Sequence, residues 1–251
     1  MALPVTSTTA QFLVTQNDVV TAALRSLKVI AIGETPATED FTNCAYALST
    51  LIKELGIENY FPWTFQNVSI PFVASQAGYT IAESGANVTS VRPMKILHAW
   101  RRDQSVPAID TPMSRFSKQQ YDQLTPKLIT GVPTNWFYDA QLGTATDFAT
   151  WYVWPAPLDT TYTGIIAIQR PLYDLTGSTQ NLDVLQEWFS TMRWILADEV
   201  SEEYEVDDLT IKRIAARAAD KRKRLSDFAQ EDASIIFQPD QQMAFGSRFD
   251  S

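Results

Sequence analysis

The sequence has little of the material from which catalytic and metal sites are usually built. It contains one histidine, His98, and one cysteine, Cys44. A structural zinc site needs four such ligands, and a serine triad could use only His98 as its base. His98 falls in KILHAWRR, an alternating run typical of a strand, and no Gly-x-Ser-x-Gly elbow occurs. We therefore expect no metal, no cofactor and no enzymatic activity.

Glycine is also scarce. The nine glycines occur in neither the G-x-G-x-x-G nor the G-x-x-x-x-G-K-[ST] spacing, which argues against a nucleotide-binding enzyme. A single cysteine excludes an internal disulfide. Because Cys44 falls on an apolar helical face, we interpret it as a small buried hydrophobic side chain.

Long apolar runs and basic charge are limited as well. No stretch reaches the roughly 18 consecutive apolar residues of a membrane span. Residues 1–17 lack the basic and apolar regions of a signal peptide, which predicts synthesis in a cytosol and no membrane partner. The net charge of −9 disfavours binding of nucleic acid, although residues 221–224 read KRKR.

What the chain does have is enough apolar material for a large core. Of its 251 residues, 45% are hydrophobic and 12% aromatic. Helical periodicity over residues 18–30, with Asn17 as N-cap, predicts a first helix. After Gly33, Thr35 as cap and Pro36 in the first position predict a second helix, which ends before Gly56.

The middle of the chain reads differently. Between residues 60 and 179, short alternating or aromatic runs are separated by Pro, Gly and Asn, a pattern typical of a small antiparallel barrel or sandwich. Strands are expected within residues 67–82, 92–102, 131–140, 149–157 and 163–172, with a short helix within residues 115–128. Prolines, which cannot donate to a sheet, are expected at strand ends or on edges.

Helical periodicity returns near Leu185 and predicts one helix to about Tyr204 and another over residues 208–233. The predicted fold is therefore α+β: a bundle of two N-terminal and two C-terminal helices with an inserted β region and extended termini. The expected parts are an N-terminal arm (1–15), a helical domain (16–59 plus 180–234), an inserted β domain (60–179) and a C-terminal tail (235–251).

The last two predicted helices carry the strongest charge feature. Residues 198–208 contain seven acidic and no basic side chains, whereas residues 212–224 contain seven basic and one acidic. These blocks either set the register of a head-to-tail contact between copies or form two solvated helix faces. The first interpretation assigns a subunit contact to Glu199, Glu202, Glu203, Arg213, Arg217, Lys221 and Arg224.

Residues 149–172, ATWYVWPAPLDTTYTGIIAIQRPL, concentrate aromatic and β-branched side chains around prolines. Trp151, Tyr152, Trp154, Pro155 and Pro157 are expected to contribute to the β core and its rim, or to the core alone. In a carbohydrate-binding or peptidoglycan-hydrolysing tail protein, the same tryptophans would instead offer a platform for sugar.

Five segments in series carry a resemblance. They are DVVTAALRSLKVIAIGETPATEDFTNCAYALSTLIKELG, QAGYTIA, RPMKI, YDQLTPKLITGVPTNWFYD and WYVWPAPLDTTYTGIIAI. In this order they resemble the head-to-tail adaptor family of tailed phages, the head-completion proteins that stabilise packaged DNA, most of all those of short-tailed phages. The resemblance covers about residues 16–205. The β region is longer than in the shortest members, and the acidic and basic blocks depart from the family pattern.

The resemblance implies a structural virion protein. Family members form a dodecameric ring beneath the portal after DNA packaging, and they offer a docking surface to a tail or nozzle protein. The expected partners are thus the portal ring, other copies of the chain, the tail, and double-stranded DNA that passes through the lumen without specific binding. The expected location is the head–tail interface of the virion, and the host cytoplasm during assembly.

The C-terminal tail is polar except for a few large apolar side chains. We hypothesise that these residues order against the portal: Ile235, Ile236, Phe237, Phe245 and Phe249. Besides the sugar-binding tail protein, an oligomeric scaffold unrelated to phages remains open.

Overall fold

The computed structural model describes residues 14–57, 61–105, 107–141, 148–175 and 177–229. The α-helices are α1 (Gln16–Leu27), α2 (Thr38–Ile57), α3 (Lys118–Asp122), α4 (Phe189–Glu199) and α5 (Asp208–Ala229), and the 3-10 helices are η1 (Pro62–Thr64), η2 (Gln186–Trp188) and η3 (Val200–Glu203). The strands are β1 (Phe65–Pro71), β2 (Gly78–Ala82), β3 (Val88–Thr89), β4 (Lys95–Asp103), β5 (Ile109–Arg115), β6 (Thr130–Gly131), β7 (Asn135–Asp139), β8 (Ala149–Trp154), β9 (Ala156–Pro157) and β10 (Tyr162–Gln169). The predicted α+β class is confirmed.

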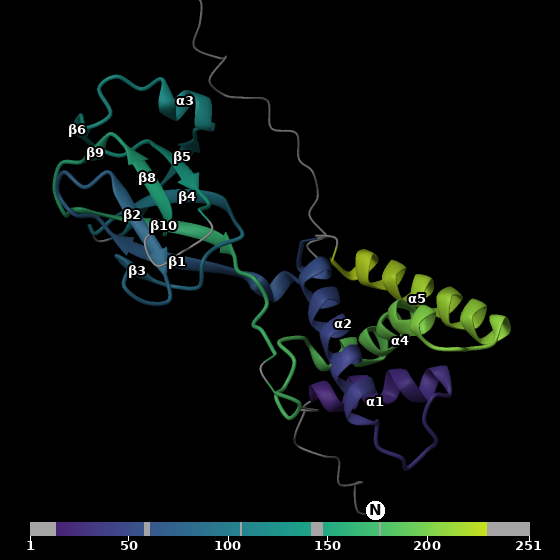
Figure 1. Ribbon diagram of the computed structural model, residues 1–251. Helices are drawn as coiled ribbons and strands as arrows, with labels where there is room; N and C mark the ends of the chain where they lie inside the picture. The colour runs from purple at the N-terminus through teal and green to yellow at the C-terminus, as the bar shows by residue number, and fades with distance from the viewer. Residues whose placement is uncertain (1–13, 58–60, 106, 142–147, 176, 230–251) are drawn as a thin grey trace, which may run out of the picture.

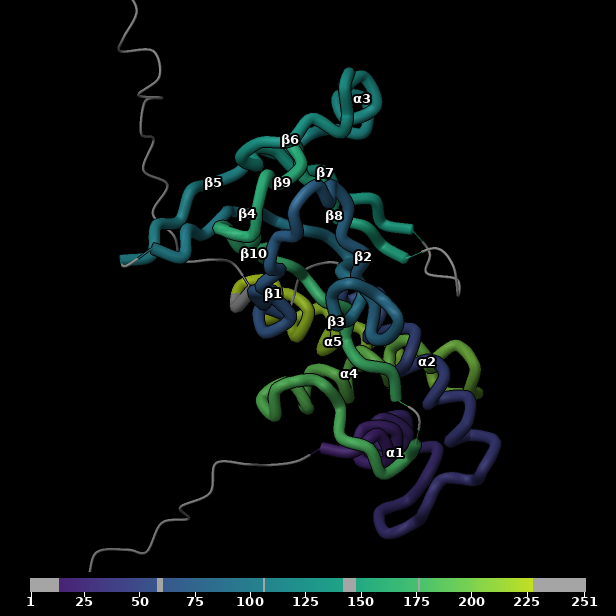
Figure 2. Tube along the Cα trace, turned by 90° about the vertical axis from the view of Figure 1, so that its left-hand side faces the viewer, coloured from purple at the N-terminus to yellow at the C-terminus, as the bar shows by residue number. Residues whose placement is uncertain are grey.

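The strands and the long helices occupy different parts of the molecule. Figure 1 shows the β-sheet at the upper left, with α1, α2, α4 and α5 grouped at the lower right. In Figure 2 the β6–β9 end of the sheet lies at the top and α1 at the bottom. The helical group therefore combines segments from both ends of the described chain, as the sequence predicts.

The large sheet is mixed rather than purely antiparallel. Among the described residues it has eight strands in the order β1-β10-β4-β5-β7-β8-β2-β3, and it is nearly closed. Most neighbours are antiparallel, but β2–β3 and β5–β7 pair in parallel, as do β6 and β9 in a separate small sheet. The antiparallel expectation fails at β5–β7 because residues 116–134 form a crossover long enough to return the chain in the same direction.

Strand β5 was not expected from the sequence. Its residues, IDTPMSR, are mostly polar and include Pro112, so the pattern does not indicate a strand. Pro112 lies opposite Trp100 of β4. On its other side β5 pairs with β7 only at Ser114 and Arg115. Pro112, which has no backbone N–H, lies before this paired stretch and so removes no hydrogen bond between β5 and β7.

Helix α1 begins two residues earlier than predicted. Its N-cap is Thr15, whose hydroxyl accepts a hydrogen bond from the Asp18 N–H at 3.3 Å. The Asp18 carboxylate in turn accepts from the Thr15 N–H at 3.0 Å. This reciprocal pair satisfies amides that would otherwise lack partners, and it displaces Asn17 from the capping role.

The other helix boundaries differ locally. Helix α2 begins at Thr38, after rather than at the predicted Thr35–Pro36 start, and it continues through Gly56. The helix predicted from Leu185 to Tyr204 is divided into η2, α4 and η3. Such divisions at helix ends are common because the last turn often tightens to 3-10 geometry.

Two hydrophobic clusters hold the fold. In the helical group, α4 packs against α1, α2 and α5. The first cluster includes Val20, Leu24, Leu48, Ile195 and Ile214. The second fills the sheet and includes Ile81, Trp136, Trp151, Ile166 and Ile168. Burial of each such side chain contributes about 1.5–3 kcal/mol.

The chain passes twice between the sheet and the helices, and the two crossings are bonded together. Arg170, which follows β10, donates two hydrogen bonds to the Asp183 carboxylate, one of them at 3.1 Å. The side chains are 12% and 23% exposed, respectively. The Arg170 N–H also donates to the carbonyl of Thr64 on the first crossing, at 3.0 Å. We call this region the junction; it comprises residues 61–64 on the first crossing and Arg170, Asp183 and Trp188 on the second.

Aromatic rings complete the junction. Phe61, Trp63 and Trp188 lie with ring centroids 5.0 to 5.2 Å apart. The Trp63 indole N–H donates to the carbonyl of Asp183 at 3.1 Å. Since these residues come from both crossings and from η2, they lock the sheet to the helical group.

Two structural expectations lie wholly or mostly outside the described residues. Of the N-terminal arm only Val14 and Thr15 are described, and the C-terminal tail is not. None of the helices in the described part of the chain is both long enough and apolar enough to cross a membrane.

Substitution of Gly164 tests the packing of the sheet interior. A Cβ there would lie 2.6 Å from the Trp151 ring and 2.7 Å from the Phe72 ring. We expect Gly164→Ala to lower the free energy of unfolding by about 1–3 kcal/mol, measured by urea denaturation. Gly56→Ala, where no atom lies within 4 Å, is the control and should be neutral or slightly stabilising. Equal stability of both variants would contradict this description.

The junction makes a second prediction. Arg170→Met leaves the sheltered Asp183 carboxylate without its partner, so the free energy of unfolding should fall by about 1–3 kcal/mol. Arg102→Met is the matched control, because Arg102 makes a similar two-bond contact with Asp110 on an open surface and its loss should change stability little. Equal effects of the two substitutions, measured by denaturation, would refute the special role of the junction.

Candidate interaction surfaces

The single histidine lies on the outer face of the sheet. His98 is exposed, and its ring stacks on Trp100 with centroids 6.0 Å apart. Arg102 donates two 2.7 Å hydrogen bonds to Asp110, which lower the pKa of that carboxyl. A mainly apolar hollow of about 420 Å³ lies beside these residues. Within the described residues the His98 imidazole makes no hydrogen bond, so no partner there orients it as a catalytic base.

The Trp100 indole N–H on the same face is buried. It makes no hydrogen bond of ordinary geometry to a described residue, although it is close enough to Asp110 to add slightly to the lowering of that pKa. The hollow is lined by His98, Ala99, Trp100, Asp110 and Pro112.

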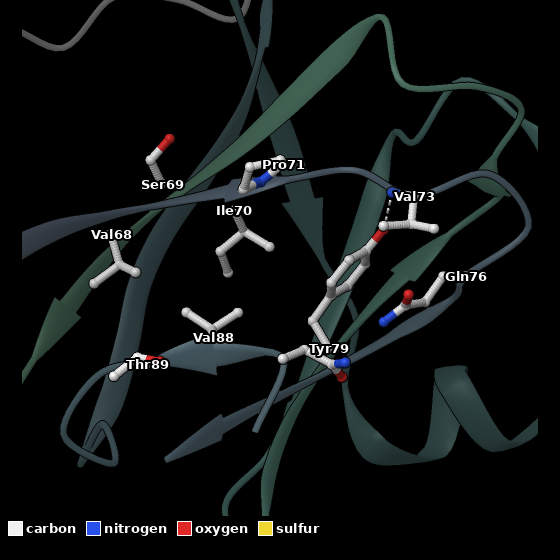
Figure 3. Close-up of a pocket in the computed structure, with 10 residues that line it drawn as sticks. Val68, Ser69, Ile70, Pro71, Val73, Gln76, Tyr79, Val88 and Thr89 are labelled. Carbon is white, nitrogen blue, oxygen red and sulfur yellow. Dashed lines mark hydrogen bonds between the residues drawn. The ribbon is translucent and has the colours of Figure 1, made fainter. Parts of the chain in front are cut away.

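The two outer strands of the sheet meet at a cleft of about 290 Å³ (Figure 3). Val68–Pro71 of β1 line one side, and Val88 and Thr89 of β3 line the other. The Val73 N–H donates to the Tyr79 hydroxyl at 3.0 Å, and burial raises the pKa of that tyrosine.

Strand β1 borders this cleft, and within the described residues it pairs with β10 on one side and has no strand on the other. The backbone N–H of Arg170 donates to the Thr64 carbonyl, and the backbone N–H of Phe72 donates to the Tyr162 carbonyl. These two bonds, just outside the two ends of β1, show which alternate residues of β1 point their backbone groups toward β10. By the alternation of an antiparallel ladder, Asn67 and Ser69 turn their backbone groups away from β10, on the side of the cleft. Such an edge can accept an extended segment of another chain.

A patch of exposed apolar side chains lies at the β6–β9 end of the sheet. We call it the apolar tip; it consists of Val73, Leu128, Ile129, Val132 and Leu158. Leu128 is 74% exposed. Hydrogen bonds from Leu158 to Gly131 and from Ser75 to Pro157 hold the segments together. Grouped apolar side chains of this kind mark contact surfaces more often than single ones do.

An aromatic stack supports the apolar tip. Tyr121 of α3 lies 5.0 Å from both Phe137 and Tyr152, measured between ring centroids. The Lys127 ammonium lies 4.9 Å from the Tyr121 ring centre and 3.8 Å from Asp122. Burial raises the pKa of Tyr121 to about 12. The stack therefore fixes α3 on β7 and β8.

The tryptophan-rich run divides between core and rim. Trp151 is fully buried, 6.0 Å from the ring centroids of both Phe72 and Tyr79. Trp154 is half-buried, and its indole N–H lies 3.4 Å from the Pro126 carbonyl. Of the two tryptophans considered as a sugar platform, Trp151 cannot contact a sugar from this position.

The residues predicted to mediate subunit contact lie on α4, η3 and α5, which we call the charged hairpin (residues 189–224). Glu199, Glu202 and Glu203 are exposed, and they make no ion pair within the described residues. The basic members Arg213, Arg217 and Arg224 are exposed, and Lys221 is half-buried. Arg224 pairs with Asp220 of the same helix at 3.1 Å. The proposed contact between copies stays a prediction.

Two residues of the charged hairpin were not singled out from the sequence. Arg193 and Trp194 lie in an otherwise apolar helix, where one arginine gives little signal. In the structure the guanidinium carbons of Arg193 and Arg217 each lie 4.7 Å from the centre of the Trp194 ring. The fold thus brings an arginine of α4 beside one of α5.

The five apolar residues assigned to portal binding all belong to residues 235–251, outside the described part of the chain. Among the described residues, no group of three or more His, Cys, Asp or Glu side chains is arranged to hold a metal ion. The surfaces described above are therefore the candidates for function.

Comparison with protein-family models gave no match, and no curated protein matched the chain.

Cys44 provides a chemical test of the helical core. It is fully buried on α2, as predicted, with its sulfur 3.7 Å from the Tyr204 hydroxyl, and burial raises the pKa of the thiol. We expect the native protein to react with Ellman's reagent at least about 100-fold more slowly than the unfolded chain. Tyr204→Ala should accelerate the reaction by uncovering the sulfur. A native rate equal to the unfolded rate would contradict this burial.

Proposed function

We propose that the protein is a head-to-tail adaptor of a tailed phage: a structural virion protein that forms a ring beneath the portal, retains packaged DNA and offers an attachment surface to the tail. The observation that carries the proposal is the series of five sequence segments, in the order of that family, over about residues 16–205. No enzymatic step belongs to this function, and its working parts are surfaces.

The geometry supports an adaptor because it offers different surfaces at opposite ends. The apolar tip lies at the β6–β9 end of the sheet, and the charged hairpin belongs to the helical group at the other end (Figures 1 and 2). The junction connects the two ends through hydrogen bonds and ring contacts. A protein that must join two dissimilar partners needs such a separation of apolar and charged contacts.

The overall charge also suits a DNA conduit. With a net charge of −9, a ring of this protein would repel duplex phosphates over a Debye length of about 8 Å at physiological salt. DNA would then slide through the lumen rather than bind. A lumen lined mainly by basic residues, in a structure of the ring, would be inconsistent with this part of the proposal.

The direct test is to mix the purified protein with portal rings and to examine the mixture by negative-stain electron microscopy and sedimentation. We expect an additional ring of density on one face of the portal. Absence of any complex would count against the adaptor function. Self-assembly without affinity for the portal would favour an unrelated scaffold, and binding to glycan arrays would favour the sugar-binding alternative.

Deletion of residues 235–251 tests the assignment of portal contact to Ile235, Ile236, Phe237, Phe245 and Phe249. We expect the truncated chain to keep its thermal transition and to lose portal binding, because each buried Phe would contribute about 2 kcal/mol before ordering costs. Unchanged docking of the truncated protein would rule out this assignment.

A further inference from the structure

Two arginines share one indole ring on the charged hairpin. Trp194 is 9% exposed, and the guanidinium groups of Arg193 and Arg217 both lie over its ring at 4.7 Å. The Arg193 Nε–H also donates to the Ser26 hydroxyl of α1 at 2.8 Å. Arg193 is therefore held in place from two sides.

No carboxylate neutralises this pair within the described residues. Neither Arg193 nor Arg217 belongs to any ion pair there. Burial, and then the charge of Arg217, lowers the pKa of Arg193, and no acidic group offsets them. Arg193 is half-buried, whereas Arg217 is exposed. Nearby like charges disfavour each other, so a carboxylate partner would relieve the repulsion, most of all at Arg193.

Arg217 also belongs to a stripe of positive charge. Arg213, Arg217, Lys221 and Arg224 recur at helical spacing along α5, over about 16 Å at 1.5 Å per residue. Arg224 is partly neutralised by Asp220. Arg213, Arg217 and Lys221 belong to no ion pair with a described residue, and of these three only Arg217 also contacts the Trp194 ring.

The same chain holds an unpaired set of acids. Glu199, Glu202, Glu203, Glu205 and Asp208 are exposed around η3, and none forms an ion pair with a described residue. The nearby acids Asp198 and Asp207 do have basic neighbours in the same chain, Arg222 and Lys28, respectively. Unpaired acids and unpaired arginines thus occur together in one polypeptide.

We propose that Arg193 and Arg217, held over Trp194, receive the acidic η3 segment of a second copy of this chain, with Glu202 and Glu203 as their carboxylate partners. This contact rests on the proposed ring, whose subunit interface it specifies. Each arginine has N–H groups that can donate to a carboxylate, and both guanidinium groups contact the same indole ring.

A phosphate backbone has the same local chemistry, but the chain as a whole disfavours it. The net charge is −9, and the seven acids of residues 198–208 lie on the same hairpin as the arginines. They would repel a duplex that approached Arg217. A second copy, in contrast, would place its η3 carboxylates against the arginines of the first copy, and its own arginines would remain available to the carboxylates of a further copy.

The test measures self-association of the full chain by analytical ultracentrifugation at 50 mM and 500 mM NaCl. We expect assembly that weakens with salt. Arg217→Glu should weaken it at least about tenfold, as should Glu202→Arg combined with Glu203→Arg. Arg217→Glu combined with a single reversal, Glu202→Arg or Glu203→Arg, leaves Arg193 facing the remaining glutamate. One of these two double variants should restore most of the affinity, which loss of folding could not do.

Controls separate this contact from general charge effects. Lys223→Glu reverses one exposed positive charge on α5, as Arg217→Glu does, but at a position away from the Trp194 ring. It should weaken assembly less than about threefold. Arg217→Lys keeps the charge but loses the planar group, so it should fall between wild type and Arg217→Glu. The melting temperature of each variant verifies that it is folded.

A monomer at every concentration in 50 mM salt, or an Arg217→Glu variant that assembles as tightly as wild type, would overturn the proposal. Loss of binding to a labelled DNA duplex, with unchanged self-association, would assign the arginines to nucleic acid instead. A two-fold dimer that depends on Arg217 would support the contact and contradict the ring. Portal binding is measured separately, so its failure does not affect this result.

Discussion

The arrangement of this protein depends on the junction, where the chain passes twice between the sheet and the helices. The Arg170 N–H donates to the Thr64 carbonyl, and the Trp63 indole donates to the Asp183 carbonyl, so these two bonds join the crossings. The Arg170–Asp183 ion pair braces the second crossing, and the rings of Phe61, Trp63 and Trp188 pack together beside these bonds. Charged groups at a sheltered position need partners of good geometry, so this pair tolerates little relative movement. The junction therefore connects the sheet, which carries the apolar tip, to the helices, which carry the charged hairpin.

The sheet meets a second constraint, that of filling a nearly closed barrel with large side chains. Trp136 and Trp151 occupy its interior, and the backbone passes so close to Trp151 that Gly164 leaves no room for a Cβ. Closure stops at β1 and β3, where the cleft lies. The sheet is thus a rigid body whose free edge and apolar tip are the places open to other chains.

The charges of the hairpin are separated along the chain and are only partly neutralised within it. Ion pairs such as Lys28–Asp207 and Arg224–Asp220 are exposed and contribute little to stability. Of the two arginines over Trp194, Arg193 is half-buried and Arg217 is exposed, and neither belongs to an ion pair with a described residue. This difference favours recognition between molecules over stabilisation within one molecule, consistent with a protein whose proposed role is assembly.

The sequence by itself determined the α+β class, the helical groups at both ends and the burial of Cys44, because period 3.6, period 2 and helix-breaking residues are local signals. It missed β5, since Pro112 and polar neighbours hide a strand whose pairing with β4 and β7 is decided by residues far away in the chain. It placed the α1 cap at Asn17 because the choice between Asn17 and Thr15 depends on the Asp18 carboxylate. Only the tertiary structure decided the parallel β5–β7 pair and the meeting of Arg193 with Arg217, because contacts between residues far apart in the chain follow from packing and leave no local pattern.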